Sequence, residues 1–412
     1  MSLSHRRILA GLLLVALALR LGWVLTRPSD AAAIELLPDQ REYLEVARSL
    51  LNGEGLSFYD PRFAQRVYAY RTPGYPLLVA ATAANVTAVR IVQAVLDTST
   101  VLAVFLLARR WLPPASCLPA AALVALNPFL IYFCGLLLTE TLFTAMLAWG
   151  MLLVTSPKAL PWLSGGVVLA LSVLVRPGAI ALPVVLGVLG ALANRRDDLA
   201  YHRWWRVPVG STMLLLTLLV LLPWAIRNQR VLGRWVWAST NEGITRYDGF
   251  NPDAAAKRFP QLGESDQRFV ADLPQLVRMS EVDRNAYLAE RAKQFMRDRP
   301  VDSLRLAGAK VLRTWSPRPL NEGFSRPLYV AVALGYAIPF AALFVAGLVL
   351  GPLPTSAKLF LTAPAVYLTL AVALSVGSLR YRLPAEPAMA VIAASALAGW
   401  GRSGKAPVVD NE

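Results

Sequence analysis

The sequence contains few charged residues for its length. Asp, Glu, Lys and Arg make up 16% of the 412 residues, whereas a soluble domain usually has about 25%. Hydrophobic residues reach 56%, and the mean hydropathy is +0.48. An apolar excess of this size has to face lipid. It excludes an ordinary soluble enzyme and favours one polytopic membrane domain over residues 1–412.

Cysteine, histidine and the common motifs of soluble enzymes are also scarce. Cys117 and Cys134 are the two cysteines, and they lack metal-site spacing. The sequence has no Walker loop, no HExxH, no GxSxG and no Rossmann fingerprint, so a soluble nucleotide-sugar donor is not indicated. The net charge is +15, but the basic residues fall mostly between apolar segments and no nucleic-acid module is present. We therefore expect membrane lipids, and no nucleic acid, as partners.

Long apolar segments recur from one end of the chain to the other. A spanning helix needs roughly 20 mainly apolar residues, and the first segment exceeds the ~7–15-residue core of a signal peptide, which indicates a retained span. The sequence thus predicts an all-α membrane protein with about ten transmembrane helices. Their ranges are 8–26, 88–109, 117–134, 138–155, 160–175, 178–193, 207–226, 327–350, 356–377 and 384–401.

Basic residues mark alternate short loops, and such loops usually lie in the cytoplasm. With ten spans, both termini are cytoplasmic, and residues 27–87 and 227–326 form two outer segments. Long loops are usually functional or disordered; these two contain aromatic residues and helical periodicity, so we expect them to be ordered. The loop residues are Arg6, Arg7, Arg109, Arg110, Lys158, Arg195, Arg196, Arg203, Arg206, Lys358, Arg402 and Lys405.

The first outer segment opens with the acid-rich stretch "PDQREYLEVARSLLNGEGLSFYD". Pro38 suits a helix start and Asn52-Gly53 suit its end, so we predict an amphipathic helix over 38–52 that lies along the membrane surface. Its apolar residues recur at helical spacing: Tyr43, Val46, Ala47, Leu50 and Leu51.

Asp39 falls in the first turn of that helix, near the positive end of the helix dipole, which favours an ionised carboxylate. One interpretation is a catalytic base held at the membrane face, where a lipid-linked substrate presents its reactive end. The alternative is that Asp39 only caps a surface helix and that the neighbouring acids form a solvated face.

Arginines are predicted at several outer helix ends. Arg71 lies in the rigid turn "YRTPGYP", Arg176 in "LVRPGA", and Arg380 and Arg382 in "LRYRLPAEP". Arginine binds phosphate oxygens in bidentate fashion, and ionisable residues at membrane depth are usually functional. These side chains are candidate ligands of a polyprenyl phosphate or diphosphate. The alternative is that they snorkel to lipid headgroups.

Three acidic or polar residues within predicted spans complete the set of candidates. Glu140, in "LLLTETLF", begins the fourth span on the outer side. It could hold a divalent metal together with Asp39, orient a sugar hydroxyl, pair with an arginine, or only cap its helix. Gln93 and Asp97 share a helix face in the second span, and we expect them and Arg20 to form hydrogen bonds between helices.

Taken in order, these stretches resemble a known family. "PDQREYLEVARSLLNGEGLSF…RTPGYPLL", "LLLTETLF", "LVRPGAI", "STNEGITRYDGFNP" and "LRYRLPAEP" resemble segments of GT-C membrane glycosyltransferases. The likeness is to the branch that contains protein O-mannosyltransferases and bacterial aminoarabinose transferases, and it covers nearly the whole chain.

The resemblance implies an inverting transfer of a sugar from a polyprenyl-phosphate donor to a lipid, glycan or protein acceptor, at the outer face of the cytoplasmic membrane. It makes Asp39 the catalytic acid residue, with Glu140 beside it to orient the sugar or a metal. It makes Arg71 a ligand of the donor phosphate, and Tyr43 matches a position four residues beyond Asp39 in that family. Arg176, Arg380 and Arg382 are further phosphate ligands, and Tyr75 and Tyr381 are candidate contacts of donor or acceptor.

The sequence departs from that family's pattern at two positions. Thr72-Pro73 stands where relatives have a Pro-Pro turn, and Glu42 stands where the aminoarabinose enzymes have an arginine. The competing function is a transporter or flippase of lipid-linked saccharides, which also needs many spans. Transporters often have repeated halves and broken mid-membrane helices, and this sequence shows no matching halves. A structural membrane protein would have no use for an outer face rich in acids and arginines.

Overall fold

The computed structural model describes residues 3–35, 37–193, 208–256, 273–320 and 326–403, with the side chains of 398–403 left aside. Within this part the chain is almost wholly helical, with one two-stranded antiparallel sheet. The bundle consists of α1 (Leu3–Leu25), α5 (Val86–Ala108), α6 (Pro114–Ala125), α7 (Pro128–Phe133), α8 (Glu140–Val154), α9 (Ala159–Val175), η1 (Pro177–Ala179), α10 (Leu182–Ala193), α11 (Val209–Leu232), α17 (Pro327–Leu350), α18 (Thr355–Ala373), η5 (Leu379–Tyr381), η6 (Leu383–Ala385) and α19 (Glu386–Ser403).

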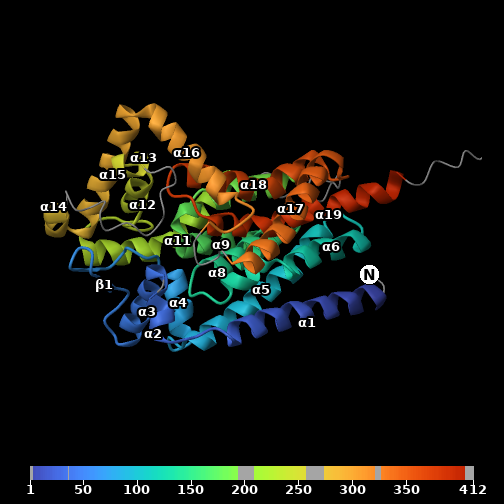
Figure 1. The fold of residues 1–412 in the computed structure, drawn as a ribbon, viewed down its shortest axis with the longest axis horizontal. Helices are drawn as coiled ribbons and strands as arrows, with labels where there is room; N and C mark the ends of the chain where they lie inside the picture. Colours follow the sequence, from blue (N-terminus) through green and yellow to red (C-terminus); the bar gives the residue numbers. More distant parts are fainter. Residues whose placement is uncertain (1–2, 36, 194–207, 257–272, 321–325, 404–412) are drawn as a thin grey trace, which may run out of the picture.

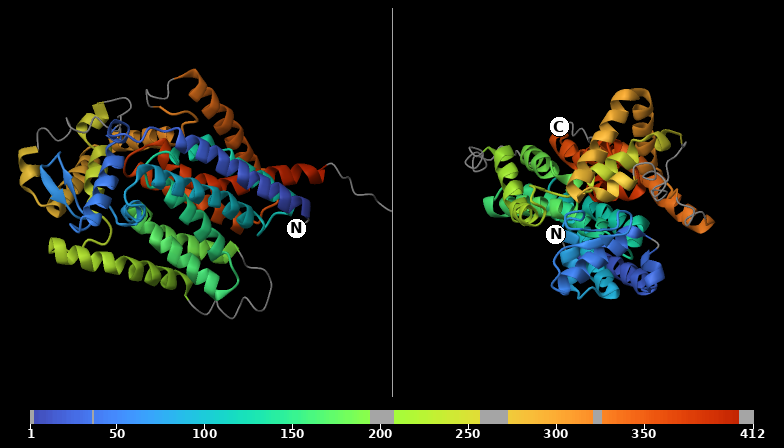
Figure 2. Two further views of the ribbon diagram at one scale, coloured as in Figure 1. Left: turned by 90° about the horizontal axis from the view of Figure 1, so that it is seen from below. Right: turned by 90° about the vertical axis from the view of Figure 1, so that its left-hand side faces the viewer.

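Shorter elements gather at one end of this bundle (Figure 1). Seen from that end, the elements of the first outer segment lie below those of the second (Figure 2, right). The first set is α2 (Ala31–Glu35), α3 (Pro38–Leu51), β1 (Phe58–Asp60), β2 (Gln65–Val67) and α4 (Gly74–Ala81). The second set is α12 (Glu242–Gly249), α13 (Pro252–Ala256), α14 (Leu273–Arg278), α15 (Glu281–Asp298) and α16 (Pro300–Thr314).

Each of the ten predicted apolar segments is helical, which confirms an all-α polytopic membrane protein. Five helices are long and apolar enough to cross a membrane, namely α1, α5, α11, α17 and α18, and α6, α8, α9 and η1–α10 are shorter apolar helices. The number of ten spans therefore stays a prediction.

One predicted span is interrupted. The segment 117–134 is divided into α6 and α7, because Asn127 caps α7 by accepting hydrogen bonds from the backbone N–H groups of Phe129 and Leu130. Helix α11 continues to Leu232, past residue 227, and the start of the second outer segment at about 227 stays a prediction.

The two ends of the bundle differ as the topology prediction requires. Helix α1 begins and α19 ends at the end opposite to α3, α12 and α15 (Figure 1). Both outer segments thus lie on one side and the first and last helices meet the other. The basic loop at 194–207, on which the cytoplasmic assignment partly depends, lies outside the described residues.

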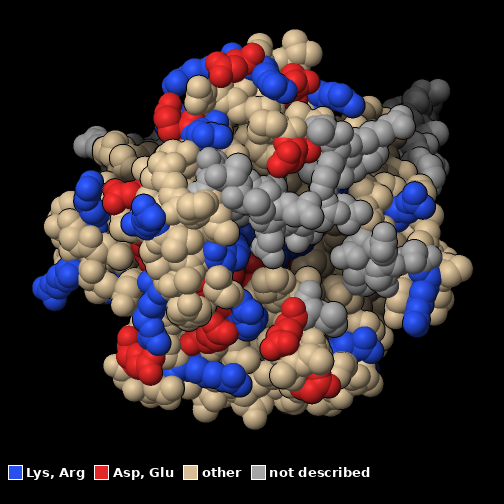
Figure 3. Space-filling model, turned by 60° about the vertical axis from the view of Figure 1, so that its left-hand side comes forward, with Lys and Arg blue, Asp and Glu red and all other residues tan. Residues whose placement is uncertain are grey.

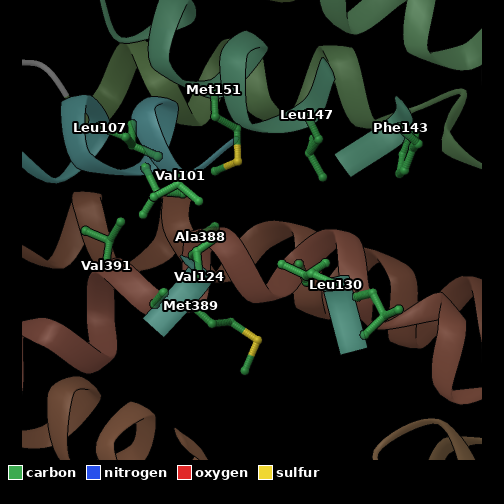
Figure 4. Close-up of a cluster of buried hydrophobic side chains, with 14 of the residues drawn as sticks. Val101, Leu107, Val124, Leu130, Phe143, Leu147, Met151, Ala388, Met389 and Val391 are labelled. Carbon is green, nitrogen blue, oxygen red and sulfur yellow. The ribbon is translucent and has the colours of Figure 1, made fainter. Parts of the chain in front are cut away.

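Close packing between helices forms the core. Apolar side chains of α5, α8 and α19, among them Val101, Met151 and Val391, meet in one cluster (Figure 4). Small residues allow the closest approach, as is usual between membrane helices. A Cβ atom at Gly165 of α9 would lie 2.7 Å from the backbone nitrogen of Val154 of α8.

The predicted polar contacts between spans are present. Arg20 Nε lies 2.5 Å from Asp97 Oδ2, both side chains are buried, and the same guanidinium donates to the carbonyls of Val124 and Ala125. Gln93 donates to the carbonyl of Leu136 at 2.8 Å. These bonds join α1, α5, α6 and the segment before α8, and so fix the frame that carries the outer segments.

Candidate active site

Helix α3 places Asp39 at the surface of the bundle. The helix runs from Pro38 to Leu51, as predicted, with Asn52 as its C-cap, and the following Gly53 adopts a φ of +78°, which glycine tolerates best. Asp39 lies in the first turn, and 26% of its side chain is exposed. The carboxylate is therefore held in place but stays within reach of a ligand.

Two arginines from distant parts of the chain form hydrogen bonds with this carboxylate. Arg71, which precedes α4, donates from Nη2 to Asp39 Oδ1, and Arg380 of η5 donates from Nη1 to Asp39 Oδ2 at 2.7 Å. The first outer segment and the loop between α18 and α19 thus meet at one point. Acidic and basic side chains lie side by side in the lower half of this face (Figure 3).

Glu140 and Arg176 extend the cluster on the side of the bundle. Glu140 Oε1 lies 3.5 Å from Arg380 Nε and 3.4 Å from Arg176 Nη2. The guanidinium of Arg176 stacks on the Tyr381 ring, 4.8 Å from its centroid, and Arg380 Nη2 lies 3.2 Å from the Tyr381 hydroxyl. Among the described residues, Glu140 Oε2 is buried without a hydrogen-bond partner. That oxygen is available to a ligand.

Tyr43 and Tyr75 lie on the Arg71 side of the cluster, and they differ in how far a substrate could reach them. Arg71 stacks on Tyr43, with the guanidinium carbon 4.8 Å from the ring centroid. Tyr43 in turn packs edge-on against Tyr75 at 4.9 Å between ring centroids. Tyr75 is fully buried and donates to Gln93 Oε1 at 2.7 Å. Tyr75 therefore supports Tyr43 and is not itself placed to contact a substrate, contrary to its assignment from the sequence.

Arg382 does not join this cluster. Its Nε donates to Glu386 Oε1 at 2.8 Å, and its Nη1 donates to the carbonyl of Ser316 at 2.5 Å. Glu386 also accepts from Asn127 Nδ2 at 2.6 Å. The predicted phosphate ligand is thus the anchor of a separate buried network, between α19, α7 and the residues that follow α16.

The sequence analysis missed Glu42 as a member of the cluster. Glu42 is 4% exposed, and it accepts from Arg71 Nε at 2.7 Å and lies 3.7 Å from Arg62 Nη2. The alternative interpretation, in which the acids near Asp39 form a solvated face, does not hold for Glu42. Its spacing of three residues from Asp39 on one helix was the signal that could have identified it.

The two carboxyl groups of α3 have opposite pKa shifts. Burial alone would raise the pKa of Asp39, but the guanidiniums of Arg71 and Arg380 outweigh it and hold the pKa well below its usual range. Burial raises the pKa of Glu42 and outweighs the opposing effect of Arg71. Asp39 is therefore ionised at any physiological pH, whereas Glu42 is more readily protonated.

The charges of the cluster suit an anion better than a divalent cation. Arg71, Arg176 and Arg380 already neutralise the carboxylates of Asp39 and Glu140, and both oxygens of Asp39 are bound by guanidiniums, which a metal would have to displace. Within the described residues, no group of three or more His, Cys, Asp or Glu side chains could hold a metal ion. A phosphate that entered would exchange one anion for another at the same donors.

An apolar cavity of about 640 Å³ lies between α17, α18 and α19. Its wall includes Trp315, Tyr336, Phe340, Phe344 and Met389, with Arg382 and Glu386 as its charged residues. Arg380 faces Asp39 and Arg382 faces this cavity, so the short segment between them separates a charged site from an apolar one.

The pairing predicts a test of stability. Arg71→Ala removes the nearest cation from the buried carboxyl group of Glu42 and one of the two cations from Asp39. Breaking a buried ion pair usually costs about 3–5 kcal/mol, so we expect a clear fall in the thermal midpoint of the purified protein in detergent. Glu42→Gln in the same chain removes the less exposed carboxyl group and should restore part of that loss, by about 1–2 kcal/mol of coupling. If the changes in stability caused by Arg71→Ala and Glu42→Gln simply added, the two side chains would not interact, which would contradict the ion pair between them. Glu45→Gln is the control, because Glu45 lies on the same helix, is half-exposed and pairs only with Arg41 among the ion pairs of the described residues.

Comparisons with known proteins identify solved structures that have a similar fold. The sequence matches no protein-family model and no curated protein. Among solved structures, the chain is similar over its whole length to the archaeal oligosaccharyltransferase AglB from Archaeoglobus fulgidus, in complex with an inhibitory peptide and a dolichol-phosphate, with 14% identity and a TM-score of 0.53, and it covers 52% of that chain.

Two further structures are similar. The Archaeoglobus fulgidus oligosaccharyltransferase in complex with Zn and sulfate has 14% identity and a TM-score of 0.53, with 95% of this chain and 48% of that one covered. ArnT from Cupriavidus metallidurans, bound to undecaprenyl phosphate, has 15% identity and a TM-score of 0.39, with 96% and 78% covered; a score this low adds nothing to the argument. The chain spans about half the length of the oligosaccharyltransferases and shares their fold, which agrees with the membrane glycosyltransferase fold expected from the sequence.

Proposed function

We propose that this protein is an inverting glycosyltransferase that moves a sugar from a polyprenyl-phosphate donor to the hydroxyl group of an acceptor. The observation that carries the proposal is one carboxylate, Asp39, bound by two guanidiniums from separate segments. Arg382, two residues beyond Arg380, lines an apolar cavity. An oligosaccharyltransferase with the same fold has been solved with a dolichol-phosphate, which agrees with a phosphate of this kind.

The donor has a charged part and an apolar part, and the structure offers a place for each. The phosphate fits the guanidiniums of Arg71 and Arg380, with Arg176 next in line behind Glu140. The prenyl chain fits the apolar cavity between α17 and α18, which holds about 640 Å³ and would accept several isoprene units. The membrane is the natural source of such a ligand, since the cavity lies between helices of the bundle.

The same arginines couple donor binding to the reactivity of Asp39. While both guanidiniums bind the carboxylate, its low pKa makes it a weak base. A donor phosphate competes for these guanidiniums, so its arrival frees an oxygen of Asp39 and raises the pKa of that group. The carboxylate then becomes a better proton acceptor only when the donor is in place.

The transfer step follows from this arrangement. The acceptor oxygen attacks the anomeric carbon from the side opposite to the phosphate, and its proton passes to Asp39. The bond between the anomeric carbon and the phosphate oxygen breaks, and its electron pair leaves with the lipid phosphate, whose charge Arg71 and Arg380 stabilise. Attack from the opposite side inverts the anomeric configuration. Glu140 Oε2, buried without a partner among the described residues, can accept a hydrogen bond from a sugar hydroxyl.

We place the reaction at the outer face of the cytoplasmic membrane, with a hexosyl or pentosyl donor and a lipid, glycan or protein acceptor. This placement rests on the predicted topology. The alternative is a flippase of the same lipid, which the apolar cavity would also suit. The two differ in chemistry, because a flippase moves the donor and leaves its sugar–phosphate bond intact.

Asp39→Asn tests the proposed base directly. The substitution keeps the size and hydrogen-bonding shape of the side chain but removes its ability to take a proton, so we expect transfer to fall by about 10²–10⁴-fold. The measurement is release of radiolabelled sugar from a polyprenyl-phosphate donor by purified protein in detergent. Glu45→Gln, on the same helix, should behave as the unaltered protein. Near-normal turnover of the Asp39→Asn protein would refute the assignment.

The pH dependence provides an independent test. Arg71 and Arg380 together hold the pKa of Asp39 low. The value of kcat/KM for the unaltered protein should therefore change little as the pH falls to 5. Arg380→Gln removes one of the two charges, so the pKa of Asp39 rises and the acid limb of kcat/KM moves to higher pH, by about one unit or more. An acid limb at the same pH in both proteins would show that the two groups are not coupled.

A further inference from the structure

Helix α16 presents an apolar face that no other described element covers. Val301, Leu304 and Leu312 are 77%, 74% and 73% exposed, and with Gly308 they lie along one side of the helix at spacings of three and four residues. Arg305 is exposed on the same side, where its long side chain can reach from an apolar surface to lipid phosphates. The opposite side is buried and carries Ser303, Leu306, Lys310 and Thr314. A helix with a packed polar side and an open apolar side is incompletely partnered in water.

We propose that this face of α16 lies in the membrane surface, with Val301, Leu304 and Leu312 inserted among the acyl chains on the side of the candidate active site. Helix α16 is not among the helices long and apolar enough to span a membrane, so it would lie in the interface and not cross it.

Continuity with a spanning helix identifies the partner as lipid. Helix α16 slopes from the outer end of the molecule towards α18 (Figure 1) and packs against it. The end of α18 next to the outer segments exposes Leu370 and Leu374, at 61% and 62%. Because α18 is long and apolar enough to cross a membrane, these two exposed leucines would face lipid, and α16 packs against the helix that leads to them.

The basic residues near α16 and the small area of its apolar face both favour lipid as the partner. Arg299, Arg305 and Arg318 are exposed in or next to α16, where they can reach the phosphates of anionic lipids. Three large apolar side chains on one helix are far fewer than the roughly 20–30 residues per side of a stable protein interface. A second copy of the chain or a protein acceptor would therefore find too little surface here.

The position of α16 gives this contact a consequence for the cavity. Trp315, the C-cap of α16, lines the cavity and donates to Thr369 Oγ1 of α18 at 2.9 Å. The next carbonyl, that of Ser316, accepts from Arg382 at 2.5 Å. Insertion of α16 into lipid thus holds one wall of the cavity in place. This consequence rests on the proposed function, whereas the insertion itself does not.

The depth of α16 in a bilayer tests the proposal without any donor or activity. Both native cysteines are buried, so single exposed cysteines can be labelled with a bimane fluorophore in the full chain. The variants are Leu304→Cys and Leu312→Cys, with Leu370→Cys as the lipid-facing control and Gln294→Cys on the exposed face of α15 as the aqueous control. The protein is placed in vesicles of phosphatidylethanolamine and phosphatidylglycerol that contain a doxyl-labelled lipid.

We expect the labels on α16 to be quenched by the doxyl lipid nearly as strongly as the label at residue 370, and several times more strongly than that at residue 294. Quenching equal to that of residue 294, together with access to aqueous iodide, would overturn the proposal. Protection from both quenchers would overturn it too, because it would mean that a protein, such as a second copy, covers the face. A chain that shows insertion but no sugar transfer would contradict the proposed function alone.

Discussion

The contact between Asp39 and the guanidiniums of Arg71 and Arg380 is the interaction on which the site depends. It joins the first outer segment to the loop between α18 and α19, two parts of the chain that the bundle alone would leave separate. A carboxylate with 26% exposure would not bind two guanidiniums so closely without a framework to hold them. Tyr43 behind Arg71, and Glu140 behind Arg380, supply that framework.

If the protein is the glycosyltransferase proposed above, this contact also accounts for how a strongly ionised carboxylate can serve as a base. Arginine is well suited to bind phosphate, so a donor phosphate would compete with Asp39 for Arg71 and Arg380. On that proposal, Asp39 becomes a good proton acceptor only when the donor is bound.

Much of this could be predicted from the sequence, for identifiable reasons. The helix 38–51 has a proline at its start, a glycine beyond its end and apolar residues at helical spacing, and these local signals placed Asp39 in the first turn. The positions of Arg71, Arg176 and Arg380 followed from topology, because each lies where an apolar segment ends. The GT-C fold followed from the order of several motifs, each of which is weak when taken alone.

The errors concern contacts that depend on packing between distant segments. Glu42 is buried because Arg71 and Arg62 meet it from elsewhere in the first outer segment, and no local pattern shows that. Tyr75 is covered once α4 packs on α3 and α5. Arg382 is two residues from Arg380, but in a 3₁₀ turn, with three residues per turn, the directions of residues two apart differ by about 120°, so one reaches Asp39 and the other reaches Glu386.

Phosphate binding to the Asp39→Asn protein tests the central claim most directly. The affinity of the purified protein for a short-chain polyprenyl monophosphate can be measured by isothermal titration calorimetry, with the Glu45→Gln protein as control. If the carboxylate holds the place of the phosphate, its removal frees Arg71 and Arg380, and the Asp39→Asn protein binds the lipid phosphate more tightly than the unaltered protein. Weaker or unchanged binding would show that Asp39 and the phosphate do not share these arginines, and would contradict the account.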